Sequence, residues 1–303
     1  MTRPRNNTII EKYIDHYKTS IASQNTRRSS LNYFFGDKYF NYIGHIFDIS
    51  KAIIDDYFNY LVDCPVSRTT KVNKWNIFMS FLKRTVYIYD EFTLILPPKN
   101  FYNFNGDHAK PINSNKNVIA DPEEIEKILL YFKEVNFKYY ILFRLFVETG
   151  MRKGELINAT LSEVNLEDRY INTFKGKTGE KFYFFTEDFQ KQFRMYLYER
   201  KKFSIDIDYL FLNNRYEQYG VRSFNKYLEK VRAKLGIKKR ITCHTFRRTI
   251  NTLRKKMGTS LEDRERLLGH KTGNVNVDGY TILDIQEHQK IYDQNFPYLE
   301  IQL

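Results

Sequence analysis

The stretch from His244 to Tyr280 concentrates side chains that can act together on a phosphodiester. It holds His244 and Arg247 in a His-x-x-Arg pattern, His270 at the end of Leu-Leu-Gly-His, and Tyr280 ten residues later. Cationic and hydrogen-bonding side chains stabilise the charge of a phosphate, and a phenol can attack phosphorus. No clustered carboxylates accompany them in the sequence, which disfavours a two-metal nuclease. The set therefore predicts phosphoryl transfer that uses no metal ion and no other cofactor.

Arg152 supplies a second guanidinium for the same pocket. It follows a long apolar helical run and a Thr-Gly break, so we expect it at the start of the helix that opens with Lys153. Backbone N–H groups and an arginine at such a place can hold a phosphate jointly. Glu155 lies three residues further on, shares the face of Arg152 and can orient its guanidinium. The plainer alternative for this spacing is an exposed Arg–Glu pair that contributes little.

The helical pattern indicates how the histidines and the second arginine are presented. His244 and Arg247 stand at positions i and i+3, which places both on one helix face beside an apolar stripe. His270 follows Gly269, a residue type common just after a helix, and is therefore expected in a turn. Taken alone, each feature is more commonly explained by a partly buried histidine or by a capping side chain. Their order along the chain gives them weight as a set.

The first hundred residues are predicted to form a helical domain of their own. Apolar residues recur there at helical spacing, which indicates a domain over 1–100, and the polar run over 101–120 is typical of a linker. One helix of this domain begins with hydroxyl and cationic side chains that could cap it and contact a phosphate backbone. The candidate DNA contacts there are Arg68, Thr69, Lys71 and Lys74. An ordinary solvated helix start is an equal alternative.

The second half of the chain, 121–303, is predicted to be mostly helical with one β-hairpin. Two β-rich runs, 169–174 and 181–185, flank a glycine-containing turn that carries lysines. The expected fold class is therefore mainly α, with a small antiparallel sheet in the second domain. Arg248 is a further candidate for contact with DNA, because it points elsewhere on its helix than the neighbouring arginine does.

The charge balance favours a polyanionic partner. The formal net charge is +13, with +5 in residues 1–110 and +8 in the remainder. Two basic halves suit a long polyanion held by both, although many basic proteins bind no nucleic acid. Cys64 and Cys243 lie far apart, so neither a disulfide framework nor a zinc site is expected. The sequence shows no signal peptide and no apolar stretch long enough for a membrane span, which predicts an intracellular protein.

In this order, the motifs resemble the tyrosine recombinase (phage-type integrase) family, in its simple two-domain, Xer-like form. The family fingerprint is Arg, Lys, His-x-x-Arg, His and a nucleophilic Tyr. The matching positions are Arg152, Lys177, His244, Arg247, His270 and Tyr280, with Glu155 as the acidic residue after the first arginine. The resemblance covers 121–303 motif by motif and implies a helical, SAM-like core-binding domain before it. An arm-type DNA-binding domain, as in large phage integrases, is not expected.

The resemblance implies a site-specific DNA recombinase that needs neither a metal ion nor ATP. Tyr280 would attack a DNA phosphodiester and form a 3′-phosphotyrosyl link, which a 5′-hydroxyl of the partner duplex later reverses. Arg152 and Arg247 would stabilise the charge added in the transition state, and Glu155 would support them without touching the phosphate. Lys177 would protonate the leaving 5′-oxygen. His244 would act as acid and base, and His270 would donate a hydrogen bond to the phosphate.

The same resemblance implies the partners. We expect double-stranded DNA with short core sites arranged as inverted repeats, gripped by the two basic domains as by a clamp. We expect a homotetramer on two such sites, a monomer or dimer without DNA, and no membrane contact. Such a protein would be cytoplasmic and associated with the nucleoid. The C-terminal tail docks on a neighbouring protomer in the family, and packing on its own protomer is an equal alternative.

The residues alone leave several alternatives open. A type IB topoisomerase uses a similar pocket to nick and reseal one strand, and a DNA-binding regulator could carry a decayed site. Lys175 or Lys181 could take the place of Lys177, because hairpin turns tolerate a shift of register. Tyr292 is the nearest rival of Tyr280 as nucleophile, but it falls within a helical run and is expected to pack.

Overall fold

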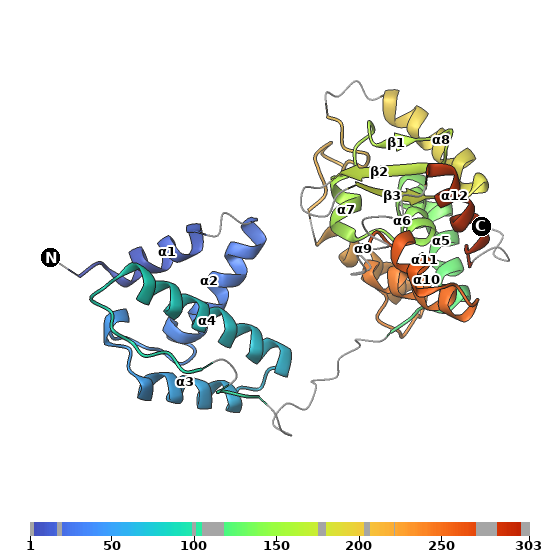
Figure 1. The fold of residues 1–303 in the computed structure, drawn as a ribbon. Helices are drawn as coiled ribbons and strands as arrows, with labels where there is room; N and C mark the ends of the chain where they lie inside the picture. Colours follow the sequence, from blue (N-terminus) through green and yellow to red (C-terminus); the bar gives the residue numbers. More distant parts are fainter. Residues whose placement is uncertain are drawn as a thin grey trace. The chain divides into compact units, whose positions relative to one another are not determined.

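A computed structural model provides the fold of the chain. It describes residues 3–16, 20–98, 101–104, 118–174, 180–202, 207–220, 222–270 and 284–297. The chain divides into two compact units, Met1–Ser114 and Asn115–Leu303, which are described separately (Figure 1).

The N-terminal unit is built from four α-helices and one short 3-10 helix in its described part. Their bounds are α1 (Asn6–His16), α2 (Ile21–Phe35), η1 (Ile46–Asp48), α3 (Lys51–Asp63) and α4 (Arg68–Ile88). Helices α2, α3 and α4 are each capped by a serine at the N-terminus. The side chains of Ser20, Ser50 and Ser67 each accept a hydrogen bond from a backbone N–H of the first turn. Such caps satisfy amides that have no partner within the helix, so the sequence itself fixes these helix starts.

An aromatic core holds these helices together. Phe34 from α2, Tyr57 from α3 and Phe78 from α4 are fully buried against one another. The segment after α4 also packs on this unit, because the Tyr102 hydroxyl donates to Asp55 and the Phe104 ring lies on the same core. The expected linker over 101–120 thus opens with residues that belong structurally to the N-terminal unit.

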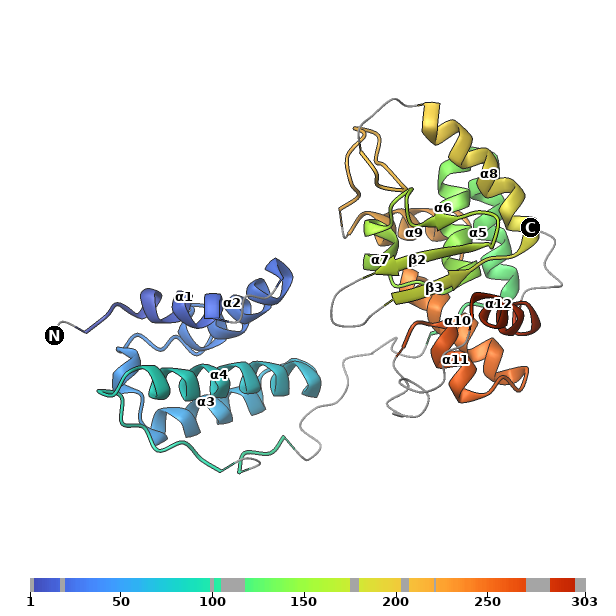
Figure 2. The ribbon, with the colours of Figure 1, turned by 45° about the horizontal axis from the view of Figure 1, so that its top comes forward.

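The C-terminal unit packs helices around a small sheet (Figure 2). Its elements are α5 (Pro122–Val135), α6 (Phe137–Thr149), α7 (Lys153–Asn158), β1 (Val164–Asn165), β2 (Tyr170–Phe174), β3 (Glu180–Phe184), α8 (Glu187–Lys202), α9 (Ser223–Lys234), α10 (Cys243–Lys256), α11 (Leu261–Leu267) and α12 (Ile285–Gln294). The strands are antiparallel in the order β1-β2-β3, with Ile171 opposite Tyr183. The predicted fold class, mainly α with a small antiparallel sheet, is confirmed.

The central helix α6 organises the C-terminal unit. Every residue from Tyr139 to Thr149 is buried, because α6 packs against α5, α8, α10 and β3. A helix that is buried on every side, with Arg144 and Glu148 paired to each other within it, can be stable only inside a core. It ends at Gly150, whose φ of +64° lies in the left-handed region that glycine adopts without strain. The chain therefore reverses at Gly150 and brings Arg152 back toward α10.

The last described helix, α12, packs on its own C-terminal unit. Tyr292 is buried, and its hydroxyl donates to the carboxylate of Glu148 at 2.9 Å. Arg169 forms a two-pronged ion pair with Asp293, at 3.0 and 2.7 Å. These contacts engage the Tyr292 hydroxyl in the core, so it is not presented to a DNA phosphate.

Within the described ranges, no helix has the length and apolar character that crossing a membrane requires. The same residues contain no group of three or more His, Cys, Asp or Glu side chains placed to hold a metal ion.

Candidate active site

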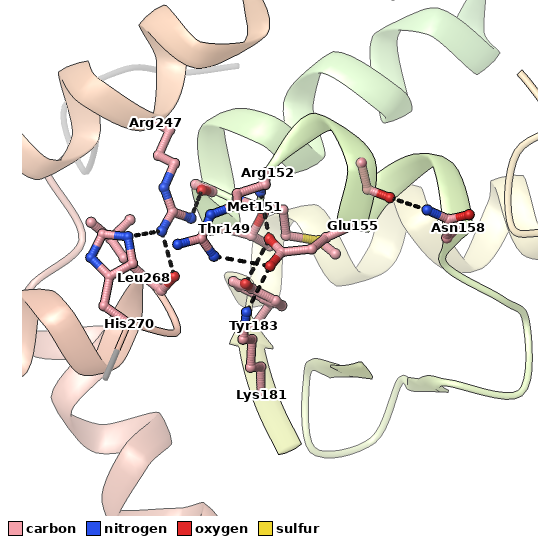
Figure 3. A network of polar contacts seen from close by, with 12 residues as sticks. Thr149, Met151, Arg152, Glu155, Asn158, Lys181, Tyr183, Arg247, Leu268 and His270 are labelled. Carbon is pink, nitrogen blue, oxygen red and sulfur yellow. Dashed lines mark hydrogen bonds and ion pairs between the residues drawn. The ribbon is translucent and has the colours of Figure 1, made fainter. Parts of the chain in front are cut away.

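Arg247 lies at the centre of the candidate site and is buried, with 4 % of its surface exposed. It comes from the second turn of α10, a helix that begins with a capping box between Thr242 and Thr245. Its guanidinium donates from Nη1 to the carbonyl of Gly150 and from Nη2 to the carbonyl of Leu268, both at 2.6 Å (Figure 3). Arg247 therefore connects the end of α6, α10 and the turn after α11.

Arg152 occupies the N-cap position of α7, next to Glu155. The Glu155 carboxylate accepts from the backbone N–H of Arg152 at 2.7 Å and from its guanidinium at 3.0 Å. Two further donors come from β3: the Lys181 ammonium at 2.8 Å and the Tyr183 hydroxyl at 2.8 Å. Figure 3 shows all of these groups converging on one carboxylate. The Arg152 side chain itself remains 43 % exposed, free to reach an anion from solvent.

This hydrogen bonding fixes the charge of Glu155. Burial by itself raises the pKa of the carboxyl group, but the hydrogen bonds from Lys181, the Arg152 backbone and Tyr183 outweigh it and lower the pKa to about 2. Glu155 is therefore ionised at any physiological pH. A permanently charged carboxylate holds Arg152 in place, which an exposed Arg–Glu pair would do only weakly.

His270 lies in the turn that follows α11. Gly269 provides this turn with a φ of +61°, and a Cβ atom there would come within 2.9 Å of both Lys181 and Tyr183. The Nε2 atom of His270 lies 2.6 Å from Nη2 of Arg247, and Nδ1 pairs with the Glu265 carboxylate. The tight turn thus places the His270 side chain between α10 and α11, next to the two arginines.

Both histidines have lowered pKa values. For His244, exposed in the first turn of α10, partial burial and the charges of Arg248, Arg247 and Arg152 lower the pKa. For His270, burial and the charge of Arg247 lower the pKa, and Glu265 opposes them. Neutral imidazoles are therefore favoured near pH 7, and a neutral imidazole can accept a proton.

The arginines create a local excess of positive charge. Burial and the nearby charge of Arg152 lower the pKa of Arg247. Two guanidinium groups that repel each other across a partly open surface are stabilised when an anion binds between them. Arg247 and His270 are thus in contact, the charge of Arg152 acts on both, and the charges of the two arginines act on His244.

The two other predicted catalytic positions, Lys177 and Tyr280, lie outside the described residues, as does Lys175. Lys181, the third candidate lysine, is described. Its ammonium is bound to Glu155, and its side chain is only 10 % exposed. This engagement favours a supporting role for Lys181 over proton transfer to DNA.

The predicted DNA contacts of the N-terminal unit separate into two groups. Arg68 and Thr69 are exposed at the start of α4. Lys71 is buried and donates to the carbonyl of Val62, and Lys74 is buried with its ammonium 3.1 Å from the centre of the Tyr33 ring. The burial of Lys71 and Lys74 corrects the expectation that all four side chains face a phosphate backbone. The helical period turns these two lysines toward the core.

Arg248, the fifth predicted DNA contact, is half-buried on α10. Its guanidinium donates from Nη1 to the carbonyl of Val118 at 3.2 Å. At the next position of the helix, the Thr249 hydroxyl accepts from the backbone N–H of Ala120 at 2.9 Å. These contacts attach the beginning of the C-terminal unit to the helix that carries the candidate site.

Three supporting residues do not follow from sequence motifs. Tyr183 and Lys181 bind Glu155 from β3, and Glu265 binds His270 from α11. The alternation of a strand places Lys181 and Tyr183 on one face, which was the available signal for that pair. Nothing in the sequence pattern distinguishes Glu265 from the other acidic residues of α11.

The fold is shared with proteins that recombine DNA. One match is the Tn1549 transposon integrase in complex with transposon right-end DNA, with a TM-score of 0.66 and 17 % identity over 93 % of this chain and 97 % of the other. Another is the site-specific recombinase XerH bound to its difH substrate, with a TM-score of 0.62 and 17 % identity over 96 % and 82 %. At these identities the likeness defines the fold.

Sequence comparison identifies the family. Tyrosine recombinase XerC of Thermodesulfovibrio yellowstonii is 26 % identical over 76 % of this chain and 77 % of its own length. Tyrosine recombinase XerA of Saccharolobus solfataricus is 30 % identical over 50 % of this chain and 47 % of its own. The model of the phage integrase family matches residues 119–287, more than half of the chain. The chain therefore belongs to the phage integrase family.

Membership confirms the predicted class of enzyme. The protein is a site-specific recombinase of the tyrosine type, which acts on DNA by cleaving and rejoining its strands. The topoisomerase and the non-catalytic regulator, both considered from the sequence, are not favoured.

Proposed function

We propose that Tyr280 is the nucleophile of this recombinase and that Arg152, His244, Arg247 and His270 form the phosphate pocket in which it reacts. Four side chains from three separate parts of the C-terminal unit come close together here, and this arrangement is the main support for the proposal. Arg247 touches His270 at 2.6 Å, and the charges of Arg247 and Arg152 both act on His244.

The proposed roles follow from the chemistry of each group. Arg247 is held by two carbonyls and Arg152 by an ionised Glu155, so both guanidiniums are positioned before DNA arrives. Groups that are positioned in advance stabilise transition-state charge without reorganising during the reaction. His244, whose pKa is lowered, acts as the base that accepts the proton of the Tyr280 phenol. His270 donates a hydrogen bond to a phosphate oxygen.

Lys177 is proposed as the acid that protonates the leaving 5′-oxygen. It belongs to the connection between β2 and β3, and Lys181 in β3 is already bound to Glu155. Because the phosphotyrosyl bond keeps the energy of the phosphodiester, the 5′-hydroxyl of the partner strand can reverse the reaction without ATP or a metal ion.

The proposed substrate is a pair of short core sites with inverted repeats, bound by a tetramer. The lambda integrase, which shares this fold at 14 % identity, forms a tetramer on a Holliday junction. A net charge of +13 supports binding to a long polyanion. A protein that acts on DNA in this way belongs in the cytoplasm with the nucleoid.

The test is covalent trapping on nicked suicide duplexes tiled across the DNA that flanks the gene. A nick near the cleavage site lets the short 5′-hydroxyl fragment diffuse away, so the phosphotyrosyl adduct accumulates. We expect adduct with the parent protein and with Tyr292→Phe, and none with Tyr280→Phe. We expect Arg152→Ala and Arg247→Ala to bind DNA but trap no adduct. Trapping that survives Tyr280→Phe, or cleavage that requires magnesium, would overturn the proposal.

A further inference from the structure

His270 makes two hydrogen bonds whose directions are fixed by chemistry. A guanidinium has donors only, so Nη2 of Arg247 must donate to Nε2 of His270, 2.6 Å away. Nε2 therefore carries no proton. The ring proton must lie on Nδ1, where it donates to the Glu265 carboxylate. The geometry of the DNA-free protein thus specifies one neutral tautomer of His270.

This tautomer is the wrong one for a phosphate. A phosphodiester oxygen can only accept, so His270 can donate to it only when Nε2 carries a proton. A neutral ring with its proton on Nε2 would place the lone pair of Nδ1 against the Glu265 carboxylate, and the two would repel each other. The doubly protonated imidazolium satisfies both neighbours, because each ring nitrogen then donates to an anion.

We propose that binding of the DNA phosphate is coupled to uptake of one proton at His270, and that Glu265 is the positioning residue that enforces this coupling. The proton comes from solvent and adds to Nε2 of His270 as Nη2 of Arg247 is released. Both groups then donate to phosphate oxygens. The inference rests on the proposed function, because it requires a DNA phosphate in this pocket.

The charges that face His270 agree with this coupling. Cations face it from several elements: Arg152 before α7, Lys181 on β3, Arg247 on α10 and Arg266 on α11. Glu180 of β3 and His288 of α12 line the same cavity. Without DNA, burial and the arginine charges lower the pKa of His270. An anion in the pocket offsets those charges and leaves the Glu265 contribution, which favours the imidazolium.

Glu265 is fixed well enough to act in this way. The backbone N–H of His270 donates to the backbone carbonyl of Glu265 at 2.9 Å, so the turn itself sets the distance between the two side chains. The carboxylate is 24 % exposed and the imidazole 31 % exposed, so both are partly withdrawn from water. Glu262, one turn earlier on α11, instead pairs with Arg266 near the surface and provides a matched control.

The experiment measures proton uptake by calorimetric titration of DNA in buffers of different ionisation enthalpy. The probe is the intact form of the duplex that the trapping assay identifies, and every protein carries Tyr280→Phe to prevent cleavage. At pH about 7.5, we expect uptake of roughly one proton per bound site in this background and with Glu262→Gln. With Glu265→Gln or His270→Asn we expect this uptake to fall to near zero. A glutamine amide can donate to Nδ1 and so permits the neutral Nε2–H tautomer.

The possible results distinguish a failure of the proton coupling from a failure of the proposed function. Equal uptake with and without Glu265→Gln overturns the coupling, as does the absence of uptake in the background protein. Loss of uptake with Glu265→Gln while the DNA still binds supports it, since a merely structural defect would lower affinity without removing a proton. If the parent protein traps no duplex, that result contradicts the proposed function itself.

Discussion

Replacing Lys181 with methionine should destabilise the C-terminal unit by about 3 kcal/mol. Methionine keeps the approximate length of the side chain but removes the buried one of the two cationic partners of Glu155 and leaves only the more exposed Arg152, and breaking a buried ion pair costs roughly 3–5 kcal/mol. The pKa of Glu155 gives the scale of the whole network. Its fall from 4.5 to about 2, to which Lys181, the Arg152 backbone and Tyr183 all contribute against burial, corresponds to on the order of 3 kcal/mol at about 1.4 kcal/mol per pH unit.

The pH dependence follows from the same shift. Because the pKa of Glu155 is lowered by folding, its contribution to stability is present above pH 4.5 and is lost as the pH falls to about 2. Lys181→Met should therefore flatten the loss of stability over this window, since the carboxyl group then titrates closer to its unfolded pKa. This change in the pH dependence of stability should appear only in the C-terminal unit, which contains Glu155.

The assay uses urea unfolding of the full chain with two signals. The single tryptophan, Trp75, lies in α4, so its fluorescence reports only the N-terminal unit, whereas circular dichroism reports helices of both units. Lys181→Met should shift the transition of the C-terminal unit and leave that of Trp75 unchanged. Lys202→Met, which removes an exposed ion pair with Glu199, should change stability by less than about 0.5 kcal/mol. If the stability of the C-terminal unit depends on pH in the same way for Lys181→Met and for the parent protein, the ion pair with Lys181 does not lower the pKa of Glu155.

Three other predictions, with four substitutions, test the structure. Gly150→Ala should cost at least about 1 kcal/mol in thermal unfolding, because the backbone there is left-handed and a Cβ atom would meet Leu268 at 2.9 Å; unchanged stability would contradict that conformation. Tyr292→Phe should cost roughly 1–3 kcal/mol in the same measurement, because it removes a hydrogen bond to buried, charged Glu148; a loss of adduct instead would point to catalysis. Arg68→Ala should reduce the salt dependence of DNA affinity by about one counterion, whereas Lys74→Met should leave it unchanged; equal slopes for both would show that burial does not separate them.

Residue spacing and the order of the motifs were enough to predict the class of fold and the class of enzyme. Helical periodicity and hydroxyl caps are local properties, so the start of α4 after Ser67 follows directly from the sequence. The glycine before His270 likewise predicts a turn, and the structure has one, with Gly269 at a positive φ. Arg152, Arg247 and His270 were predicted as one set and lie together, because the chain after α6 and the turn after α11 both meet α10 at Arg247.

Long-range packing sets which side chains form hydrogen bonds with these residues and which cationic side chains face solvent. Lys71 and Lys74 look like DNA contacts in the sequence, yet the packing of α4 buries both. Glu155 gains Lys181 and Tyr183 from a strand 26 and 28 residues away, and Glu265 becomes the partner of His270 through a five-residue turn. Periodicity specifies the face on which a side chain lies, but its partner depends on long-range packing that no local spacing encodes. For that reason the sequence predicted the pocket, while the protonation of its histidine follows from three-dimensional contacts.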